Sequence, residues 1–157
     1  MIYFPFKVKL YSNRGTSGID GNIATSLGIA SQSNQNNYLV IGDQSFMHDV
    51  GSLQILAEKK QKLTIFIVNN YGGSIFNYLP NLKKIDSNSF ENYILNKHSN
   101  DFESIVKSYG LKYKKISSIN DLKDIDMDET KIYEIIINDK DSIEYIRNFS
   151  TSLYSHD

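Results

Sequence analysis

The sequence contains no cysteine, no marked excess of charge of either sign and no long apolar run. The absence of cysteine excludes disulfide bonds, thiolate metal sites and a cysteine nucleophile, and it makes a cytosolic location the expectation. With 17 basic and 18 acidic residues the net charge is −1, so electrostatics gives no reason to expect nucleic acid or an anionic membrane as a partner. No apolar run approaches the roughly 20 residues that span a bilayer. We therefore expect residues 1–157 to form a single globular domain with its own core.

Two short apolar runs end at polar residues, and the rest of the chain can be placed around them. The first run, residues 38–41, leads to Asp43, and the second, residues 63–68, leads to Asn70. Both runs are apolar at almost every position, which predicts strands covered on both faces, as in a parallel sheet. Apolar residues between the runs recur at helical spacing and predict one helix: Phe46, Met47, Val50, Leu53, Leu56 and Ala57. The segment is therefore expected to form a strand-helix-strand unit.

A right-handed crossover brings the carboxyl ends of both strands to one edge of the sheet, where ligands of open α/β sheets bind. Asp43 and Asn70 are then expected to face one crevice. A carboxylate oxygen, an amide oxygen and a backbone carbonyl from the glycine-rich turn at Gly72 suit Mg²⁺, which prefers oxygen ligands and often retains substrate phosphates. Two loops at this edge lead into helix N-termini at Gln44 and Ser74, whose free N–H groups suit a diphosphate. Alternatively, Asp43 caps a helix and the residues around Asn70 form an ordinary turn.

The spacing of these residues resembles the thiamine-diphosphate motif, in which Gly-Asp opens a segment that closes at Asn-Asn and a following glycine. Here Gly-Asp ends at Asp43, Asn-Asn ends 27 positions later at Asn70, and Gly72 stands where the carbonyl ligand belongs. A second block, SNRGTSGIDG over residues 12–21, resembles the loop of the 2-succinyl-5-enolpyruvyl-6-hydroxy-3-cyclohexene-1-carboxylate synthases, hereafter the synthase family. These are thiamine-diphosphate enzymes of menaquinone and phylloquinone biosynthesis. The two blocks together are more specific than either alone, and the resemblance covers essentially the whole chain.

The resemblance implies the fold of the family's C-terminal, diphosphate-binding domain. This is an α/β domain, a three-layer, doubly wound and mostly parallel sheet. Residues 6–10 alternate apolar with basic and predict a short strand, so the loop that follows can lie at the same edge as Asp43. The pyrimidine-binding and central domains of the family are expected to be absent from this chain, and residues 81–96 resemble the family's variable segment over the cofactor mouth.

The resemblance also implies roles for individual residues. Asp43, Asn70 and the carbonyl of Gly72 would ligate Mg²⁺, for which Mn²⁺ can substitute. The remaining residues would contact cofactor or substrate: Gln44 and Ser45 at the diphosphate, Ile19 as an apolar wedge under the cofactor, the Ser17 carbonyl at the aminopyrimidine, Ile75 and Phe76 as an apolar wall, and Arg14 at a substrate carboxylate. Judged without the motif around them, the three apolar residues would be core residues, and the arginine could be a solvated loop residue.

Other polar residues give weaker signals. His48 and Asp49 are adjacent, and adjacent residues of a helix point to different faces, so we expect first-turn helix residues rather than a catalytic pair. His98 has no assignable partner and is expected to be an ordinary surface residue. Asn100 and Glu103 predict a capping box at the start of a later helix.

By resemblance, the full enzyme decarboxylates 2-oxoglutarate on thiamine diphosphate and joins the product to isochorismate. A glutamate of the pyrimidine-binding domain activates the cofactor in this family, so we expect this chain alone to be inactive. It would then be a fragment or split subunit, working in a homo-oligomer or with a chain that supplies the missing domain. Two alternatives remain open: another thiamine-diphosphate lyase or carboligase, or a non-catalytic remnant that binds cofactor or a partner without turnover.

Overall fold

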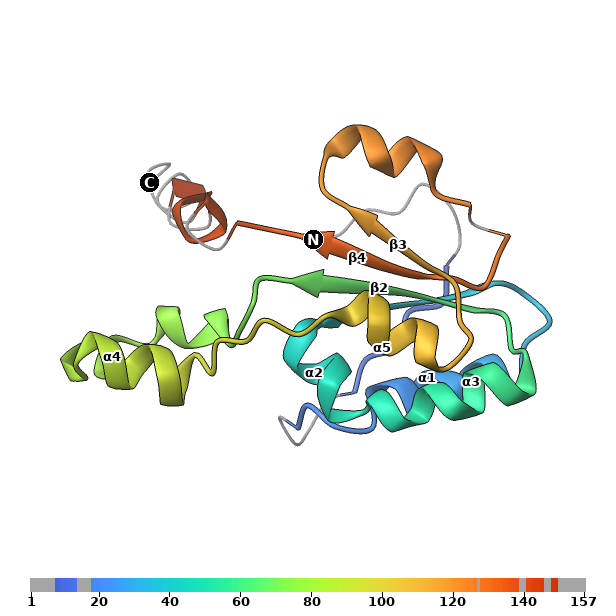
Figure 1. Ribbon diagram of the computed structural model, residues 1–157, viewed down its shortest axis with the longest axis horizontal. Helices are drawn as coiled ribbons and strands as arrows, with labels where there is room; N and C mark the ends of the chain where they lie inside the picture. The colour runs from blue at the N-terminus through green and yellow to red at the C-terminus, as the bar shows by residue number, and fades with distance from the viewer. Residues whose placement is uncertain (1–7, 14–17, 127, 139–140, 146–147, 150–157) are drawn as a thin grey trace.

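Four parallel strands form the sheet that organises the molecule (Figure 1). The computed structural model describes residues 8–13, 18–126, 128–138, 141–145 and 148–149. The strands are β1 (Asn37–Gly42), β2 (Leu63–Asn69), β3 (Tyr113–Ile116) and β4 (Ile132–Ile136). They lie in the order β1-β2-β4-β3, and every neighbouring pair is parallel. Strands β2 and β4 are therefore central, and β1 and β3 are the edges.

Helices and short helical turns connect the strands. Four α-helices lie against one face of the sheet (Figure 1): α1 (Asn22–Ala30), α2 (Asp43–His48), α3 (Leu53–Lys59) and α5 (Phe102–Ser108). The shorter segments are 3₁₀ turns at Val50–Ser52, Ser74–Tyr78, Pro80–Lys84 and Ile119–Asp124, helix α4 (Ser87–Ser89), and the π-helix Phe90–Ile94. Residues 141–145 and 148–149 are also helical. The segment that carries α4 extends beyond the carboxyl end of β2 (Figure 1).

Strand β2 shows how the apolar pattern builds the sheet. Its residues alternate between the two faces, and Leu63, Ile65 and Ile67 are buried in the core on the helical face. On the opposite face Phe66 stacks on Tyr133 of β4, with the ring centroids 5.3 Å apart. Strand β2 is thus buried on its helical face and partly covered on the opposite face, where Phe66 and Val68 are half-buried; its continuous apolar run predicts full cover on both faces.

Strand β1 differs, because it is covered on one face only. Ile41 is buried, whereas Tyr38 and Val40 are exposed, Val40 to 71%. The prediction that both faces of this strand are covered is therefore wrong. The physical reason is its place in the sheet: β1 is an edge strand, and the helices that pack on it lie on a single side.

The core lies between the sheet and the four helices. Phe46 of α2 and Phe102 of α5 meet edge to face, with centroids 5.4 Å apart and an interplanar angle of 88°. Burying a large apolar side chain contributes about 1.5–3 kcal/mol, and this pair joins the helix that begins at Asp43 to the helix that follows the α4 segment. The rest of this core includes Ile23, Leu27, Ala30, Ile41, Leu53, Leu56, Leu63, Ile65, Ile67, Val106 and Ile132.

The connection from β1 to β2 is broken rather than a single helix. It consists of α2, a 3₁₀ turn and α3, and the break comes at Asp49, whose φ is −126°. The Asp49 carboxylate reaches to helix α1, where its Oδ2 accepts hydrogen bonds from the backbone N–H groups of Ile23 (2.6 Å) and Ala24 (2.9 Å). Its Oδ1 accepts from the Ser52 hydroxyl at 2.6 Å. Asp49 therefore satisfies free N–H groups at the start of α1. The prediction of His48 and Asp49 as first-turn helix residues is wrong, because His48 is the last residue of α2 and Asp49 follows it.

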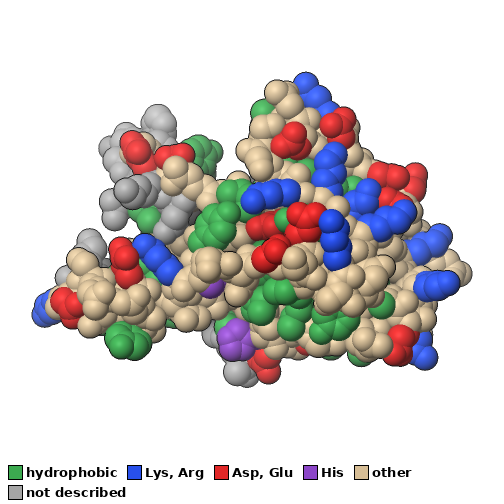
Figure 2. Space-filling view, in the orientation of Figure 1, with side chains coloured by type: hydrophobic (Ala, Val, Ile, Leu, Met, Phe, Trp, Pro, Cys, Tyr) green, Lys and Arg blue, Asp and Glu red, His purple; other side chains and the backbone are tan. Residues whose placement is uncertain are grey.

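The architecture confirms the predicted class, an α/β domain built on a parallel sheet. Residues 8–10, predicted to belong to a strand, lie outside the sheet, and the rest of that prediction falls on residues that the structure does not describe. Within the described ranges, no helix has the length and apolar character needed to cross a membrane. On the face drawn in Figure 2, Lys and Arg side chains are interspersed with Asp and Glu, in keeping with the net charge of −1.

Candidate functional site

The carboxyl ends of β1 and β2 bring Asp43 and the turn at residues 70–73 together. The two strands pair in register, with Gly42 beside Val68, so Asp43 begins α2 next to the point where Asn70 leaves β2. The side chain of Asp43 is buried, with 3% of the residue exposed. Its Oδ1 accepts from the backbone N–H of Gln44 at 2.7 Å, and its Oδ2 accepts from the backbone N–H of Gly72 at 3.0 Å. A carboxylate buried at a strand tip is thus held by backbone donors from both loops.

The amide of Asn70 closes this group of polar atoms. One terminal atom of the amide lies 3.2 Å from Asp43 Oδ2 and 2.6 Å from the Gly72 carbonyl oxygen, and the other lies 2.9 Å from the Ser74 hydroxyl. With nitrogen facing Asp43, the amide donates to both oxygens and accepts from Ser74. With oxygen facing Asp43, a carboxylate, an amide and a carbonyl oxygen converge with no proton between them, an arrangement that a cation stabilises. The same residues therefore suit either a hydrogen-bonded state or a cation-bound state.

This donor set fits a hard divalent cation. All three donors are oxygen atoms, and a single carboxylate with carbonyl-type oxygens is the chemistry that Mg²⁺ accepts while it keeps other positions for water or phosphate. Among the described residues, no cluster of three or more His, Cys, Asp or Glu side chains has the arrangement of a metal site, so a soft or nitrogen-rich centre has no counterpart there. The residues predicted as metal ligands, Asp43, Asn70 and Gly72, are the ones that the structure brings together.

Glycine is required at position 72 by two independent constraints. Its φ is +156°, and a Cβ there would lie 2.8 Å from the carbonyl oxygen of Leu95. The next residue, Gly73, donates its backbone N–H to the same Leu95 oxygen at 2.6 Å. The turn is therefore packed against the segment that returns from α4, and its carbonyl is fixed by that packing.

A buried polar network supports the turn from behind. Asn69, fully buried at the end of β2, donates from Nδ2 to Glu134 Oε1 at 2.6 Å, and its own Oδ1 accepts from the backbone N–H of Tyr71 at 2.8 Å. Glu134 on β4 also accepts from the Tyr113 hydroxyl of β3. Burial and the nearby Glu134 carboxylate raise the pKa of Tyr113 above its ordinary value. Three strands thus orient the amide that holds Tyr71 in its left-handed conformation (φ 62°).

The residues predicted to form the apolar wedge and wall at the cofactor lie on the surface rather than in the core. Ile19, Ile75 and Phe76 are all exposed, Ile75 to 72%. The carbonyl of Ile19 accepts from the Ser45 hydroxyl at 2.6 Å, and Asn22 Nδ2 donates to the Ser45 oxygen at 2.8 Å. This network ties the loop before α1 to the first turn of α2. The interpretation of these three residues as core residues is therefore excluded by their exposure.

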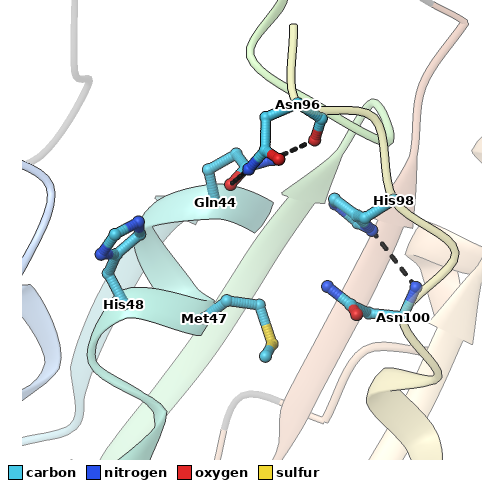
Figure 3. Close-up of a pocket in the computed structure, with 6 residues that line it drawn as sticks. All are labelled: Gln44, Met47, His48, Asn96, His98 and Asn100. Carbon is cyan, nitrogen blue, oxygen red and sulfur yellow. Dashed lines mark hydrogen bonds between the residues drawn. The ribbon is translucent and has the colours of Figure 1, made fainter. Parts of the chain in front are cut away.

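Within the described part of the chain, the side chain of Gln44 forms its hydrogen bonds with Asn96 and not with the loop before α1. Its Nε2 donates to the Asn96 carbonyl oxygen at 2.8 Å, and its Oε1 accepts from Asn96 Nδ2 at 3.1 Å (Figure 3). The side chain thus anchors the segment that returns from α4, while only the backbone N–H faces Asp43.

Arg14 and Ser17, predicted to contact substrate and aminopyrimidine, lie outside the described residues.

His98 belongs to this site, so its prediction as an ordinary surface residue is wrong. Its Nε2 lies 3.1 Å from Asp43 Oδ2, and 11% of its side chain is exposed. The two residues are 55 positions apart, and the contact depends on the course of the segment 81–96. The sequence carries no periodicity or motif that shapes this segment, so no local signal identifies His98.

Comparison with known proteins yields relatives for most of the chain. Residues 3–130 match the family model described as thiamine pyrophosphate enzyme, C-terminal TPP binding domain. Two curated relatives are named 2-succinyl-5-enolpyruvyl-6-hydroxy-3-cyclohexene-1-carboxylate synthase. The one from Staphylococcus epidermidis is 32% identical over 97% of this chain, and the one from Lysinibacillus sphaericus is 35% identical over 75%. The matched parts span 27% and 20% of these relatives. Their name is the one that the two sequence blocks predict.

A solved structure shares the fold. Benzoylformate decarboxylase from Polynucleobacter necessarius superposes on 75% of this chain and 23% of its own, with a TM-score of 0.59. The two sequences are 18% identical, so this likeness concerns the arrangement of strands and helices and not the substrate.

Proposed function

The chain belongs to the thiamine pyrophosphate enzyme family, as a C-terminal TPP binding domain, and we propose that the carboxyl edge of its sheet holds the Mg²⁺-bound diphosphate of thiamine diphosphate. The observation that carries this proposal is the convergence of Asp43, the Asn70 amide and the Gly72 carbonyl. These three residues would bind the cation. The first turn of α2, at Gln44 and Ser45, would lie beside the diphosphate.

The other predicted residues have surroundings that suit a bound cofactor. Ile19 is exposed, and its carbonyl is fixed by Ser45, so its side chain is available as a wedge. Ile75 and Phe76 are exposed just beyond the turn at Gly72 and would exclude water from one side of the cofactor. Thiamine diphosphate, when bound, supplies the electron sink for decarboxylation and carbon-carbon bond formation, and the protein supplies position and electrostatics.

We further propose that this domain is part of a synthase that joins isochorismate to decarboxylated 2-oxoglutarate. The names of the curated relatives favour this reaction over other thiamine-diphosphate lyases and carboligases. Arg14, in the block SNRGTSGIDG, would hold a substrate carboxylate with its planar guanidinium. The pyrimidine-binding domain and its glutamate would be supplied from outside residues 1–157, so this chain alone would bind cofactor without turnover.

Calorimetry of the 157-residue chain with thiamine diphosphate, with and without Mg²⁺, tests the cofactor site. We expect Mg²⁺-dependent binding in the wild type and its loss in Asp43→Ala, because this substitution removes the charged ligand. Glu58→Ala serves as a matched control, because Glu58 is an exposed carboxylate on α3, bonded to Gln54 and remote from the turn. Equal affinity in Asp43→Ala and the wild type would refute the metal assignment.

Reconstitution tests the reaction. The purified chain is mixed with a separately expressed pyrimidine-binding portion of a synthase, Mg²⁺, thiamine diphosphate, isochorismate and 2-oxoglutarate. Product formation supports the synthase assignment. Cofactor binding without product, in a mixture whose pyrimidine-binding portion is active with its own diphosphate-binding domain, identifies a binding module without turnover.

A further inference from the structure

We propose that His98 is a positioning residue for the cation site and that its Nε2–H holds the Asp43 carboxylate in the orientation that binds the metal. This inference rests on the proposed function, since it takes Asp43 as a metal ligand. It assigns a role to a residue that lies outside both sequence blocks, on the segment between α4 and α5.

The tautomer of His98 follows from its second hydrogen bond. The backbone N–H of Asn100 donates to His98 Nδ1 at 3.3 Å (Figure 3). Because Nδ1 is an acceptor in this bond, the proton of the neutral ring is on Nε2. That proton faces Asp43 Oδ2 at 3.1 Å. The backbone thus sets the ring to donate to the carboxylate.

Packing fixes the plane of the ring. The His98 ring contacts Phe102 with centroids 5.7 Å apart at 80°, and it lies 6.1 Å from the Tyr71 ring at 53°. Phe102 is buried and packs in turn against Phe46 of α2, the helix that Asp43 begins. The donor and the acceptor are therefore held on elements that are packed together, so the bond costs little additional ordering.

Cation binding makes this bond more important for Asp43. When Asn70 turns its amide oxygen toward the cation, it no longer donates to Asp43 Oδ2. The donors that remain on the carboxylate in the described part of the chain are the backbone N–H groups of Gln44 and Gly72 and the ring of His98. His98 is the side chain among them. Hydrogen bonds of this kind orient carboxylate ligands, and their removal typically weakens metal affinity by about 10–100-fold.

A second histidine provides a matched control. His48 and His98 line the same cleft of about 250 Å³ between α2 and residues 96–100. Figure 3 shows His48 across the cleft from His98, and within the described residues His48 forms no hydrogen bond with Asp43. The same substitution at the two positions therefore removes a histidine from the same cleft. At position 98 it also removes the hydrogen bond to Asp43, and at position 48 it does not.

The experiment is a titration with Mn²⁺ alone, followed by electron paramagnetic resonance of the free ion, on the 157-residue chain. We expect His98→Leu to weaken Mn²⁺ binding by about 10–100-fold, and His98→Gln, whose amide N–H can take the place of Nε2–H, to retain most of the wild-type affinity. His48→Leu and His48→Gln should bind as the wild type does. Thermal melting without metal shows whether each variant is folded at the temperature of the titration.

Two results would overturn the role of His98 while leaving the metal site intact. One is wild-type affinity in His98→Leu, and the other is an equal loss in His98→Leu and His98→Gln, which would make ring packing and not the N–H group responsible. Nitrogen NMR of the wild type provides a check that needs no variant: the Nε2–H tautomer is expected in the Mg²⁺-loaded chain, and the Nδ1–H tautomer would contradict the proposal. Absence of Mn²⁺ binding in the wild type would instead overturn the proposed function, and the role of His98 with it.

Discussion

Replacing Glu134 by leucine is expected to destabilise the domain through two hydrogen-bond donors that lose their acceptor. Glu134 is 4% exposed, and its carboxylate accepts from Asn69 Nδ2 at 2.6 Å and from the Tyr113 hydroxyl. A buried donor without a partner costs about 1–3 kcal/mol, so the fully buried Asn69 amide predicts a loss of about 1–3 kcal/mol in the free energy of unfolding. The Tyr113 hydroxyl, which is half-buried, adds a smaller loss. Since domains of this kind are stable by about 5–15 kcal/mol, the effect is large enough to measure.

Urea unfolding of a small set of variants separates this cause from loss of packing. Glu134→Gln keeps the shape, and its single amide oxygen can still accept from Asn69 while its NH₂ group donates to the Tyr113 hydroxyl oxygen. It should therefore lose less stability than Glu134→Leu, although both bonds lose the charge assistance that makes such bonds about twice as strong as neutral ones. Tyr113→Phe in the Glu134→Leu background removes one of the two orphaned donors. The double variant should therefore be less destabilised than the sum of the single variants.

The reasoning would be refuted by strict additivity of the two substitutions, or by a Glu134→Leu chain as stable as the wild type.

The network also predicts an effect on the cation site. Without Glu134, the Asn69 amide has no fixed orientation and no longer holds the backbone N–H of Tyr71. Mg²⁺ affinity should fall in Glu134→Leu at temperatures where the chain is still folded.

Three further changes follow from single observations. The pKa of Tyr113 is raised above its unfolded value of 10.0, so the stability it contributes is present below pH 10.0 and is lost as the pH rises further; urea unfolding of Tyr113→Phe should show a smaller decline above that pH than the wild type. Asp49→Ala removes the acceptor for two N–H groups of α1 and should cost about 0.5–2 kcal/mol, whereas an unchanged urea midpoint would contradict the capping role. Gly72→Ala would place a Cβ 2.8 Å from the Leu95 carbonyl oxygen, at a φ of +156° that residues with a side chain rarely adopt. The substitution should lower the free energy of unfolding by about 1–3 kcal/mol and weaken Mg²⁺ binding. Gly28→Ala is the control: its Cβ would lie in open space, so it should not destabilise the helix that contains it.

The parts of the site that the sequence predicts are those placed by the backbone alone. Apolar runs locate the strands, and the right-handed crossover brings their carboxyl ends to one edge. Asp43 and Asn70 each lie two positions after the end of such a run, so their proximity requires no knowledge of side-chain packing. The same holds for Gly72, because a turn after a strand tip has few possible positions. The resemblance to a known family then supplies the chemistry for a geometry that the pattern already implies.

The predictions that failed depend on side chains that reach beyond their own element. Apolar spacing predicts one continuous helix between β1 and β2. It does not reveal that the helix is interrupted at Asp49, whose carboxylate caps α1. The capping box predicted for Asn100 and Glu103 is wrong: the N-cap is Asp101, whose carboxylate accepts from the backbone N–H of Ser104. In both cases a carboxylate has several backbone donors within reach, and the tertiary structure selects among them.

Two residues that carry no signal in the sequence, His98 and Glu134, share a physical role in this site. Each is held by packing or by a strand, and each supplies a hydrogen bond to a polar side chain that a strand tip delivers: Asp43 for His98, and Asn69 for Glu134. The backbone at the end of a strand fixes the position of a side chain's Cβ atom but not the dihedral angle that orients its terminal carboxylate or amide group. Cation binding requires one particular value of that angle. Residues that set it can come from any element that packs nearby, so their positions follow from the folded structure and not from a spacing rule. Substitutions at these two positions should therefore alter metal affinity at an unchanged ligand set, which distinguishes orientation of the ligands from their identity.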